Sequence, residues 1–427
     1  MSGVRSFLAL QSTVMTTAQS PAGVLTFEQA NETVRSYCRN LCMRNTEYVA
    51  LPGALGRVLA EPVAADRDFP PFPRSTRDGY AVRAADLQPL PAKLRVLGQV
   101  KAGGTFKGTV GPGEAVEIMT GAPVPPGADA VVMVEYTLLS ISQVEIQRGA
   151  KPGENLVPSG AEAHAGDVLL APGAHIGPAQ TALAAAVGRA KLAVYRRPRV
   201  AVLATGDELV DISDVPGPHQ IRNTNIYSLS AQILKAGGEP VQLPVAPDEE
   251  RKLTTLIHAG LDAADLLLLS GGVSMGKFDL VEQALSGLGA QFFFTGALIQ
   301  PGRPVVFGEI RKNSRTIPFF GLPGNPVSVM TTFDLFVRPV IDALSGAPPR
   351  PMAGVCARMK ESFQTKTGLT RFLPAILTGG LYDPLVEIVH WQGSGDLVAA
   401  SKANCYLVVA PHREMIPEGE LVTVVLR

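Results

Sequence analysis

The sequence predicts a multidomain α/β protein, and three observations support this fold class. Short apolar runs alternate with helical segments between residues 198 and 345, as in a parallel sheet that is covered on both faces. Before this region, short β-rich runs alternate with glycine and proline, as in a small β lobe. The chain has 427 residues, enough for about three or four domains of ~100–150 residues each.

The first element that we expect is an amphipathic helix over residues 25–45. Thr26 is a suitable N-cap, and Gln29 is spaced to return a hydrogen bond from its side chain. Residues 1–24 contain no acids and many serines and threonines, and we expect a disordered start there rather than a transit peptide. Prolines over residues 69–73 then interrupt any regular element.

A β-rich lobe follows over residues 73–162. It carries the three clearest strand-like runs before the α/β region, at 116–119, 130–134 and 143–146. A further strand-like run and an Ala-rich helix come after the lobe. We therefore expect the segments 25–72 and 163–197 to form one discontinuous mixed α/β domain from which the lobe projects.

The α/β domain is predicted over residues 198–345 and is expected to resemble the MogA fold discussed below. Its predicted strands and helices, in chain order, are 200–204, 225–236, 240–245, 249–262, 266–269, 279–288, 292–294, 305–307 and 327–344. Glycine and prolines over 346–351 indicate a linker. Residues 350–427 are predicted to form a C-terminal β domain.

Charge and cysteine content exclude several classes of protein. Lys+Arg and Asp+Glu both number 38, so a protein that coats nucleic acid is not expected. No apolar run approaches the ~20 residues of a membrane span. The four cysteines form no dense framework, which favours a reducing cytoplasm. Cys38 and Cys42 lie one helical turn apart, and two buried thiols are favoured over a metal pair because no second pair completes a site.

Ligands of an open parallel sheet bind beyond the carboxyl ends of its strands, so the loops there are the candidate site. Asp207 and Glu208 follow the first strand, and adjacent carboxylates there can coordinate Mg²⁺ beside a phosphate, or Asp207 can cap a helix. A glycine-rich turn follows the strand at 266–269 and allows a ligand close to the backbone. Its candidate residues are Ser270, Gly271, Gly272, Ser274, Gly276 and the helix-capping or metal-binding Asp279.

Two further loops and one segment of the lobe complete the candidates. Asn325 is a suitable N-cap and Pro326 suits the first helical position, while the rigid loop before them is typical of a binding site. Arg303 either pairs with an anion or is a solvated turn residue. The segments 74–82 and 117–132 carry more polar groups than a turn requires. The remaining candidates are Asp78, Thr120, Pro301, Gly302, Gly324 and Ser328.

Together these motifs resemble the MoeA family of molybdopterin molybdenumtransferases and the matching domain of gephyrin. The motifs that carry the resemblance are Asp78–Val82, Met119–Ala122, Thr205–Leu209, Ser270–Gly276, Pro301–Pro304 and Gly321–Ser328. The resemblance implies a homodimer with a MogA-like domain and a cleft completed by the lobe of the other subunit. A MogA-type partner is a further expectation.

The implied reaction joins adenylyl-molybdopterin and molybdate, with Mg²⁺, to give molybdenum cofactor and AMP. The resemblance assigns catalysis to Glu208, Asp279 and Asp207, and metal binding to Glu208, Asp279 and Asp78. The remaining candidates would hold the nucleotide and the pterin. The alternatives are a paralog that takes another oxyanion such as tungstate, and a dimeric scaffold without catalysis.

Several positions depart from the family pattern. Asn223 stands where an acid is usual, and Gln300 stands where a lysine commonly precedes Pro-Gly. A second lysine is missing near Thr295, and Leu369 follows a glycine that an arginine often follows. Lys277 replaces a residue that is often acidic or glycine, and can partly restore positive charge. These changes all affect the anion site, so they leave Arg303 as the nearest evident cation there.

Overall fold

The computed structural model describes residues 23–41, 45–272 and 280–427. The chain divides into two compact units, one comprising Met1–Arg44 and Arg196–Arg427, the other Asn45–Tyr195. Each unit has its own hydrophobic clusters. Within the described ranges, no helix combines the length and apolar character needed to cross a membrane.

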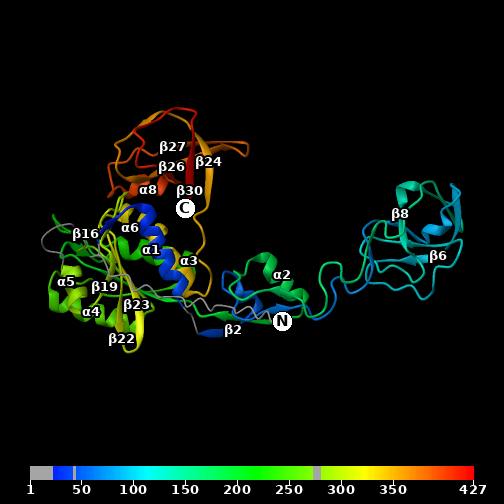
Figure 1. The fold of residues 1–427 in the computed structure, drawn as a ribbon, viewed down its shortest axis with the longest axis horizontal. Coiled ribbons are helices and arrows are strands. Elements are labelled where there is room, and N and C mark those ends of the chain that lie inside the picture. The colour runs from blue at the N-terminus through cyan, green and yellow to red at the C-terminus, as the bar shows by residue number, and fades with distance from the viewer. Residues whose placement is uncertain (1–22, 42–44, 273–279) are drawn as a thin grey trace, which may run out of the picture. The chain divides into compact units, whose positions relative to one another are not determined.

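A six-stranded sheet forms the centre of the first unit (Figure 1). Its strand order is β17 (Glu239–Gln242), β14 (Arg199–Ala204), β18 (Leu266–Ser270), β23 (Arg315–Leu322), β22 (Val306–Lys312) and β19 (Gln291–Phe294). The first four strands are parallel, but β22 and β19 are antiparallel to their neighbours, so the predicted sheet is parallel only in part. Asn313 and Ser314 both have positive φ, and such a two-residue turn joins adjacent antiparallel strands.

Helices cover both faces of this sheet. Alternate residues of β14 point to opposite faces, with Val200 and Val202 in one cluster and Ala201 and Leu203 in the other. The cluster of Ala201 and Leu203 includes residues of α4 (Glu250–Ala263) and α5 (Leu280–Gly287). The opposite cluster includes residues of α3 (Asn225–Ala236), α6 (Pro326–Thr332), the π-helical turn Phe333–Val337 and α7 (Arg338–Leu344).

Helix α1 (Phe27–Asn40) begins as predicted, because Thr26 and Gln29 exchange the two hydrogen bonds of a capping box. Its buried stripe, Ala30, Val34 and Cys38, has a four-residue spacing and packs against α7. The structure therefore groups this helix with the α/β domain and not with the mixed domain to which we assigned it. Strand β1 (Val24–Leu25) also pairs with β20 (Gly296–Ala297), so the expected disordered start does not extend to Val24.

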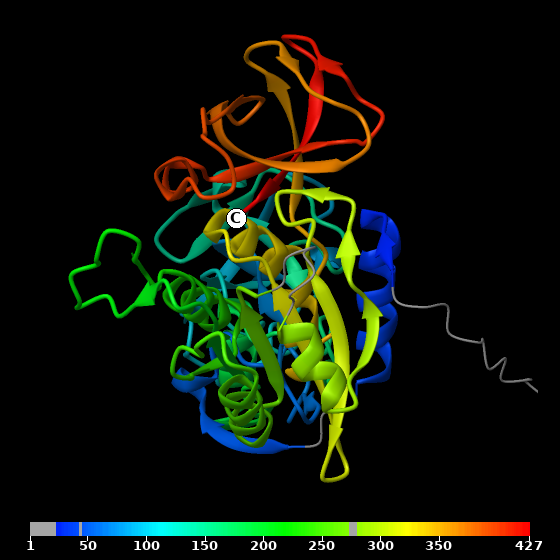
Figure 2. The same ribbon diagram turned by 90° about the vertical axis from the view of Figure 1, so that its left-hand side faces the viewer.

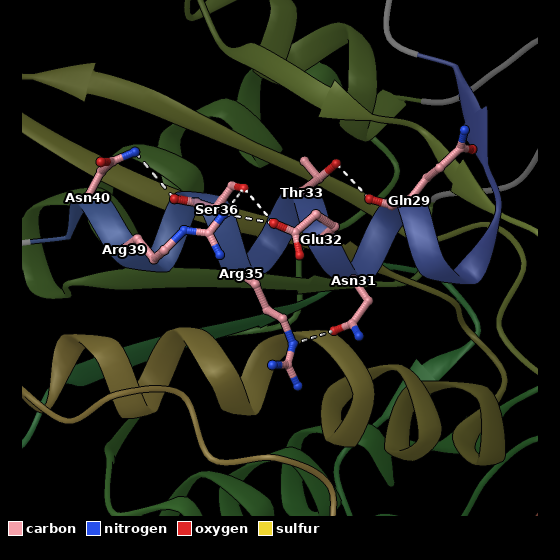
Figure 3. A network of polar contacts seen from close by, with 8 residues as sticks. All are labelled: Gln29, Asn31, Glu32, Thr33, Arg35, Ser36, Arg39 and Asn40. Carbon is pink, nitrogen blue, oxygen red and sulfur yellow. Dashed lines mark hydrogen bonds and ion pairs between the residues drawn. The ribbon is translucent and has the colours of Figure 1, made fainter.

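The other side of α1 carries a polar network (Figure 3). Arg39 donates to Glu32 over 2.7 Å, and Ser36 donates to the same carboxylate over 3.1 Å. Such exposed pairs contribute little to stability. Cys38 is instead buried and donates to the carbonyl of Pro339, and its burial raises the pKa of the thiol to about 12. Cys42 lies outside the described residues.

The C-terminal domain is a closed β-barrel (Figure 2). Its strands follow the order β26 (Thr370–Gly380), β27 (Asp383–Ile388), β24 (Gly354–Met359), β30 (Leu421–Leu426) and β28 (Cys405–Val409), and β28 pairs again with β26. Strand β21 (Ile299–Gln300) joins this sheet beside β26, although it precedes the barrel by about 50 residues or more. A short helix, α8 (Leu397–Lys402), lies between β27 and β28.

The second unit contains the predicted β lobe. Its six-stranded sheet has the order β8 (Ala130–Met133), β5 (Gly79–Val82), β7 (Glu114–Ile118), β6 (Ala92–Val100), β10 (Gln143–Ile146) and β9 (Thr137–Leu139). Beside it, β4 (Arg74–Ser75) pairs with β11 (Leu156–Val157). Separate clusters on the two sheet faces make this lobe a small folded body with its own core.

The remainder of the second unit is a small mixed α/β part. Its two strand pairs are β2 (Thr46–Ala50) with β13 (Lys191–Tyr195), and β3 (Val63–Ala64) with β12 (Val168–Leu170). Helix α2 (Pro178–Ala186) and the 3₁₀ turn Leu51–Ala54 complete it around one apolar cluster. The segments before and after the lobe therefore pack together in this part, and helix α1 is not included in it.

Candidate functional site

A cavity of about 1400 Å³ opens in the first unit, where the parallel strands β14, β18 and β23 end. The loops after these strands line it, together with the loop after β21 and two segments of the C-terminal barrel. Of the predicted site residues, those that line it are Glu208, Ser270, Gly271, Gly272, Pro301, Gly302, Arg303, Gly324, Asn325, Pro326 and Ser328. Predicted loops from four distant positions in the sequence thus lie together.

The loop after β14 separates the two predicted carboxylates. Glu208 lines the cavity, whereas Asp207 is absent from the lining and accepts a hydrogen bond from the backbone N–H of Asp248 over 3.2 Å. Asp248 lines the cavity itself, although the sequence analysis did not select it. Its signal was available, since Asp248 follows a strand of the parallel sheet and precedes a helix.

The turn after β18 needs glycine for steric reasons. Gly271 and Gly272 have φ values of +91° and +66°, which favour glycine. A Cβ at Gly271 would lie 2.6 Å from the carbonyl oxygen of Thr205, so no other residue fits without a backbone shift. The rest of this predicted turn, with Ser274, Gly276, Lys277 and Asp279, lies outside the described residues.

Asn225 connects two of these loops at the start of α3. Its Nδ2 donates to Ser270 Oγ and to the carbonyl oxygen of Gly324, over 2.8 Å in each case. Asn223 is 4% exposed, and its Oδ1 accepts a hydrogen bond from the N–H of Ile226 over 3.3 Å. Both asparagines line the cavity, and Asn223, which precedes the N-cap residue Thr224, also accepts from a first-turn N–H of α3.

The loop after β23 starts helix α6 as predicted, with Asn325 at the N-cap and Pro326 at the first position. The side chain of Asn325 makes no capping bond, however, and its Nδ2 donates to Ser394 Oγ over 2.9 Å. The N–H of Val327 donates to the carbonyl of the same serine over 3.0 Å. This loop is therefore attached to the C-terminal barrel.

Two arginines supply positive charge to the cavity lining. Arg303 lies in the loop after β21, where Gly302 has a φ of +101° and a Cβ would meet Thr332 at 2.4 Å. Arg222 also lines the cavity, and its Nε donates to the carbonyls of Ile212 and Asp214 over 3.0 and 3.2 Å. Sequence analysis found Arg303 and missed Arg222. The lining thus contains both cations and acids.

The C-terminal barrel contributes lining residues that the sequence analysis did not select, apart from Leu369, which it noted as a departure from the family pattern. Leu369, Trp391, Ser394 and Leu397 line the cavity from this side. Arg371 is 6% exposed, and its Nη1 donates to the carbonyl of Leu369 over 3.2 Å. The Gly-Ser-Gly segment between a strand and a helix was a usable signal, but no local pattern indicates that it meets loops of the α/β domain.

Asp78 and Thr120 belong to the second unit. They lie at neighbouring ends of the antiparallel strands β5 and β7, in which Gly79 pairs with Ile118. The carboxylate of Asp78 accepts hydrogen bonds from the backbone N–H and the hydroxyl of Thr120, over 2.6 and 2.8 Å. These bonds lower the pKa of Asp78, the backbone bond having the larger effect.

The cavity provides ligands of the kind that Mg²⁺ requires. The described part of the chain contains no group of three or more His, Cys, Asp and Glu side chains that could hold a metal ion. Glu208 and Asp248 are nevertheless both in the lining, and Mg²⁺ takes one or two carboxylates together with substrate oxygens and water. Glu208 and Asp248 are therefore of the chemical type that could take part in such a site, with substrate oxygens and water as the other ligands.

Three family models match the chain in sequence order. The MoeA N-terminal region (domain I and II) matches residues 25–188, a probable molybdopterin binding domain matches 201–343, and the MoeA C-terminal region (domain IV) matches 356–426. The cavity is thus formed by the second and third of these regions.

Curated relatives match over nearly the whole length. The chain is 34% identical to the molybdopterin molybdenumtransferase of Bacillus subtilis over 93% of each chain. It is 36% identical to that of Haemophilus influenzae, with 89% of this chain and 93% of the relative covered. A MoeA crystal structure from Pyrococcus horikoshii has a TM-score of 0.77 at 29% identity, covering 95% of this chain and 100% of that one. The chain belongs to the MoeA family.

Proposed function

We propose that this protein is a molybdopterin molybdenumtransferase, which inserts molybdate into adenylyl-molybdopterin and releases AMP. The observation that carries this proposal is the cavity at the strand ends, most of which lies in the region matched by the molybdopterin-binding model. It combines a glycine turn, two arginines and two carboxylates. These are groups that a pyrophosphate, an oxyanion and a divalent cation need in one place.

Each group has a separate task in this reaction. The backbone of Gly271 and Gly272 allows the phosphates to approach closely, and Arg303 and Arg222 attract the anionic substrates. Asn225 holds the glycine turn and the Gly324 loop at a fixed separation. The two dithiolene thiols of the substrate bind the molybdenum of molybdate, and one molybdate oxygen leaves with their protons as water. A water molecule adds to the pyrophosphate bond, so that AMP leaves and the other phosphate stays on the pterin.

Carboxylates alone would repel these substrates, so the proposal includes Mg²⁺. We propose that Glu208 and Asp248, in the loops after β14 and β17, hold the ion. We also propose that Asp279 is a further ligand. When bound, Mg²⁺ supplies positive charge beside the pyrophosphate. Asp207 has a supporting task, because it holds the backbone of Asp248.

The deciding experiment is AMP release from adenylyl-molybdopterin by the purified protein with Mg²⁺, with and without molybdate. Molybdate-dependent release supports the transferase. Tight binding of the adenylate without such release contradicts it. The curated relatives are transferases, so a binding-only scaffold is not favoured. Replacing molybdate by tungstate in the same assay identifies the preferred metal.

We also propose a cytoplasmic homodimer that receives its adenylated substrate from a MogA-type partner. The family pattern assigns Asp78 and Thr120 to the same reaction. The two hydrogen bonds from Thr120 hold the Asp78 carboxylate in one orientation, which supports a role in substrate binding. Light scattering on the purified protein tests the dimer. A monomer with full activity would contradict it.

A further inference from the structure

Trp391 is the single tryptophan of the chain, and it lies in the cavity wall. It occupies the loop between β27 and α8 of the barrel. The Trp391 side chain is partly buried and packs against the core of the barrel, and the residue also lines the cavity. An aromatic ring at such a boundary presents a flat apolar surface to whatever enters.

The loop that carries Trp391 has a defined internal structure. The carboxylate of Asp396 accepts hydrogen bonds from the N–H groups of Gln392 and Ala399, each over 3.0 Å. These bonds lower the pKa of Asp396, the one from Ala399 most, so the carboxylate remains charged and keeps both contacts near neutral pH. The residue after Trp391 is thereby attached to the first turn of α8.

The same loop is fixed to the opposite side of the cavity. Ser394 accepts hydrogen bonds from Asn325 Nδ2 and from the N–H of Val327, over 2.9 and 3.0 Å. Both donors belong to the loop that starts α6, which itself lines the cavity. The tryptophan is therefore held at a set position relative to the α/β domain, and less conformational freedom is lost when a ligand binds.

The charged side chains of the described lining all come from the α/β domain, which also contributes apolar residues such as Leu253 and Val281. The α/β domain contributes the carboxylates of Glu208 and Asp248 and the cations Arg222 and Arg303. The large barrel side chains in the lining are apolar, namely Leu369, Trp391 and Leu397. A ligand that suits both sides carries charge at one end and a flat apolar ring at the other.

We propose that Trp391 is the stacking surface for a flat heteroaromatic ring of the substrate, and so determines which ring the site accepts. This inference rests on the proposed function, which supplies two such rings, adenine and the pterin. A ring stacked on an aromatic side chain gains a contact through its π face, and larger rings gain more. Purines and pterins are therefore favoured over pyrimidines.

The test is calorimetric titration of AMP, CMP and pterin-6-carboxylate into the full-length protein and into Trp391→Phe and Trp391→Leu. For the ring that stacks, we expect Trp391→Leu to weaken binding by about 5- to 100-fold, and Trp391→Phe to weaken it only a few-fold. The same ring quenches the tryptophan fluorescence of the unmodified protein. The affinities of AMP and of pterin-6-carboxylate are measured separately, so the compound whose affinity falls in Trp391→Leu identifies the ring that stacks on Trp391.

Tyr382→Leu is the matched control, because Tyr382 is an aromatic residue of the same barrel and is 96% exposed outside the cavity lining. It should leave all affinities unchanged. Unaltered affinity of both ring compounds for Trp391→Leu overturns the inference, as does failure of both to bind the unmodified protein. If Trp391→Leu does not fold, equal affinity of Trp391→Phe and the unmodified protein, without fluorescence quenching, also overturns it. Ring binding that depends on Trp391 without molybdate-dependent AMP release would contradict the proposed function alone.

Discussion

The side-chain nitrogen of Asn225 lies 2.8 Å from the hydroxyl oxygen of Ser270, at the point where strand β18 ends. The same nitrogen is equally close to the carbonyl of Gly324, so one amide group joins two loops of the cavity. Asn225→Leu removes both bonds at similar side-chain volume. We expect it to lower stability by about 1–2 kcal/mol and to weaken AMP binding.

Thermal unfolding and AMP titration measure these two effects, and Ser270→Ala provides the comparison. This variant deletes one of the two bonds, so its effects should be smaller. In the double variant the effects should be less than additive, because both changes remove the same contact. Strict additivity would show that Asn225 and Ser270 act independently.

Replacing Glu208 by alanine or glutamine should remove Mg²⁺-dependent AMP release and leave the protein folded. The Glu208 side chain is exposed in the cavity and makes no hydrogen bond to another described residue, while its backbone carbonyl accepts from the N–H of Ile221, which a substitution keeps. Loss of the carboxylate should therefore change stability by less than about 0.5 kcal/mol. Activity assays with circular dichroism check both parts. Release at the normal rate from Glu208→Gln would exclude this carboxylate from the mechanism.

Asn223→Asp should restore the charge that the family pattern has at this position. Asn223 lines the cavity and accepts from a first-turn N–H of α3, and aspartate accepts equally well, so the fold should be retained. We expect half-maximal AMP release at a lower Mg²⁺ concentration. The control, Asn223→Ala, should lose about 1 kcal/mol of stability without this gain. An unchanged Mg²⁺ dependence in Asn223→Asp would contradict the expectation.

The Asp78–Thr120 contact should make stability depend on pH. The pKa of Asp78 is lowered in the folded protein, so the carboxylate stabilises the fold above its unfolded pKa of about 3.9. This contribution is lost as the pH falls through the lowered folded pKa. Asp78→Asn should therefore be less stable than the unmodified protein near pH 6, and the difference should shrink at acidic pH.

Urea unfolding between pH 6 and pH 3 measures this difference. Thr120→Val serves as the intermediate case, since it removes the hydroxyl donor but keeps the backbone N–H that lowers the pKa most. A stability difference between Asp78→Asn and the unmodified protein that stays constant with pH would show that the carboxylate charge is not what matters.

Several helices and strands in both units were predictable because their signals are local. The helix 225–236 and the strand 143–146 have the predicted bounds, and the capping box of Thr26 and Gln29 forms as expected. Strand ends also indicated most loops of the cavity, because the carboxyl ends of parallel strands share one edge of a sheet. The direction of β22 was missed, since the predicted strand contained only residues 305–307 and left the Asn313–Ser314 turn unrecognised.

Long-range packing was not predictable in the same way. An amphipathic stripe such as Ala30, Val34 and Cys38 shows that a helix is buried but does not identify its partner, which proved to be α7. For the same reason, the cavity residues of the barrel other than Leu369, including Trp391, were missed. Asp248 follows strand β17, which ends at Gln242, and it was not selected although its place between a strand and a helix was visible in the sequence.

The pairing of β21 with β26 limits how this protein can be recombined. Residues 299–300 are encoded within the α/β domain but form a strand of the barrel sheet, in register with Thr370 and Arg371. The linker after residue 345 is therefore not a boundary between two domains that fold independently of each other. A chimera that exchanges only the C-terminal segment would pair a β26 from another protein with the original β21, directly beside the cavity loop that follows β21. A chimera that keeps this pairing has to take residues 299–300 and the C-terminal barrel from the same protein.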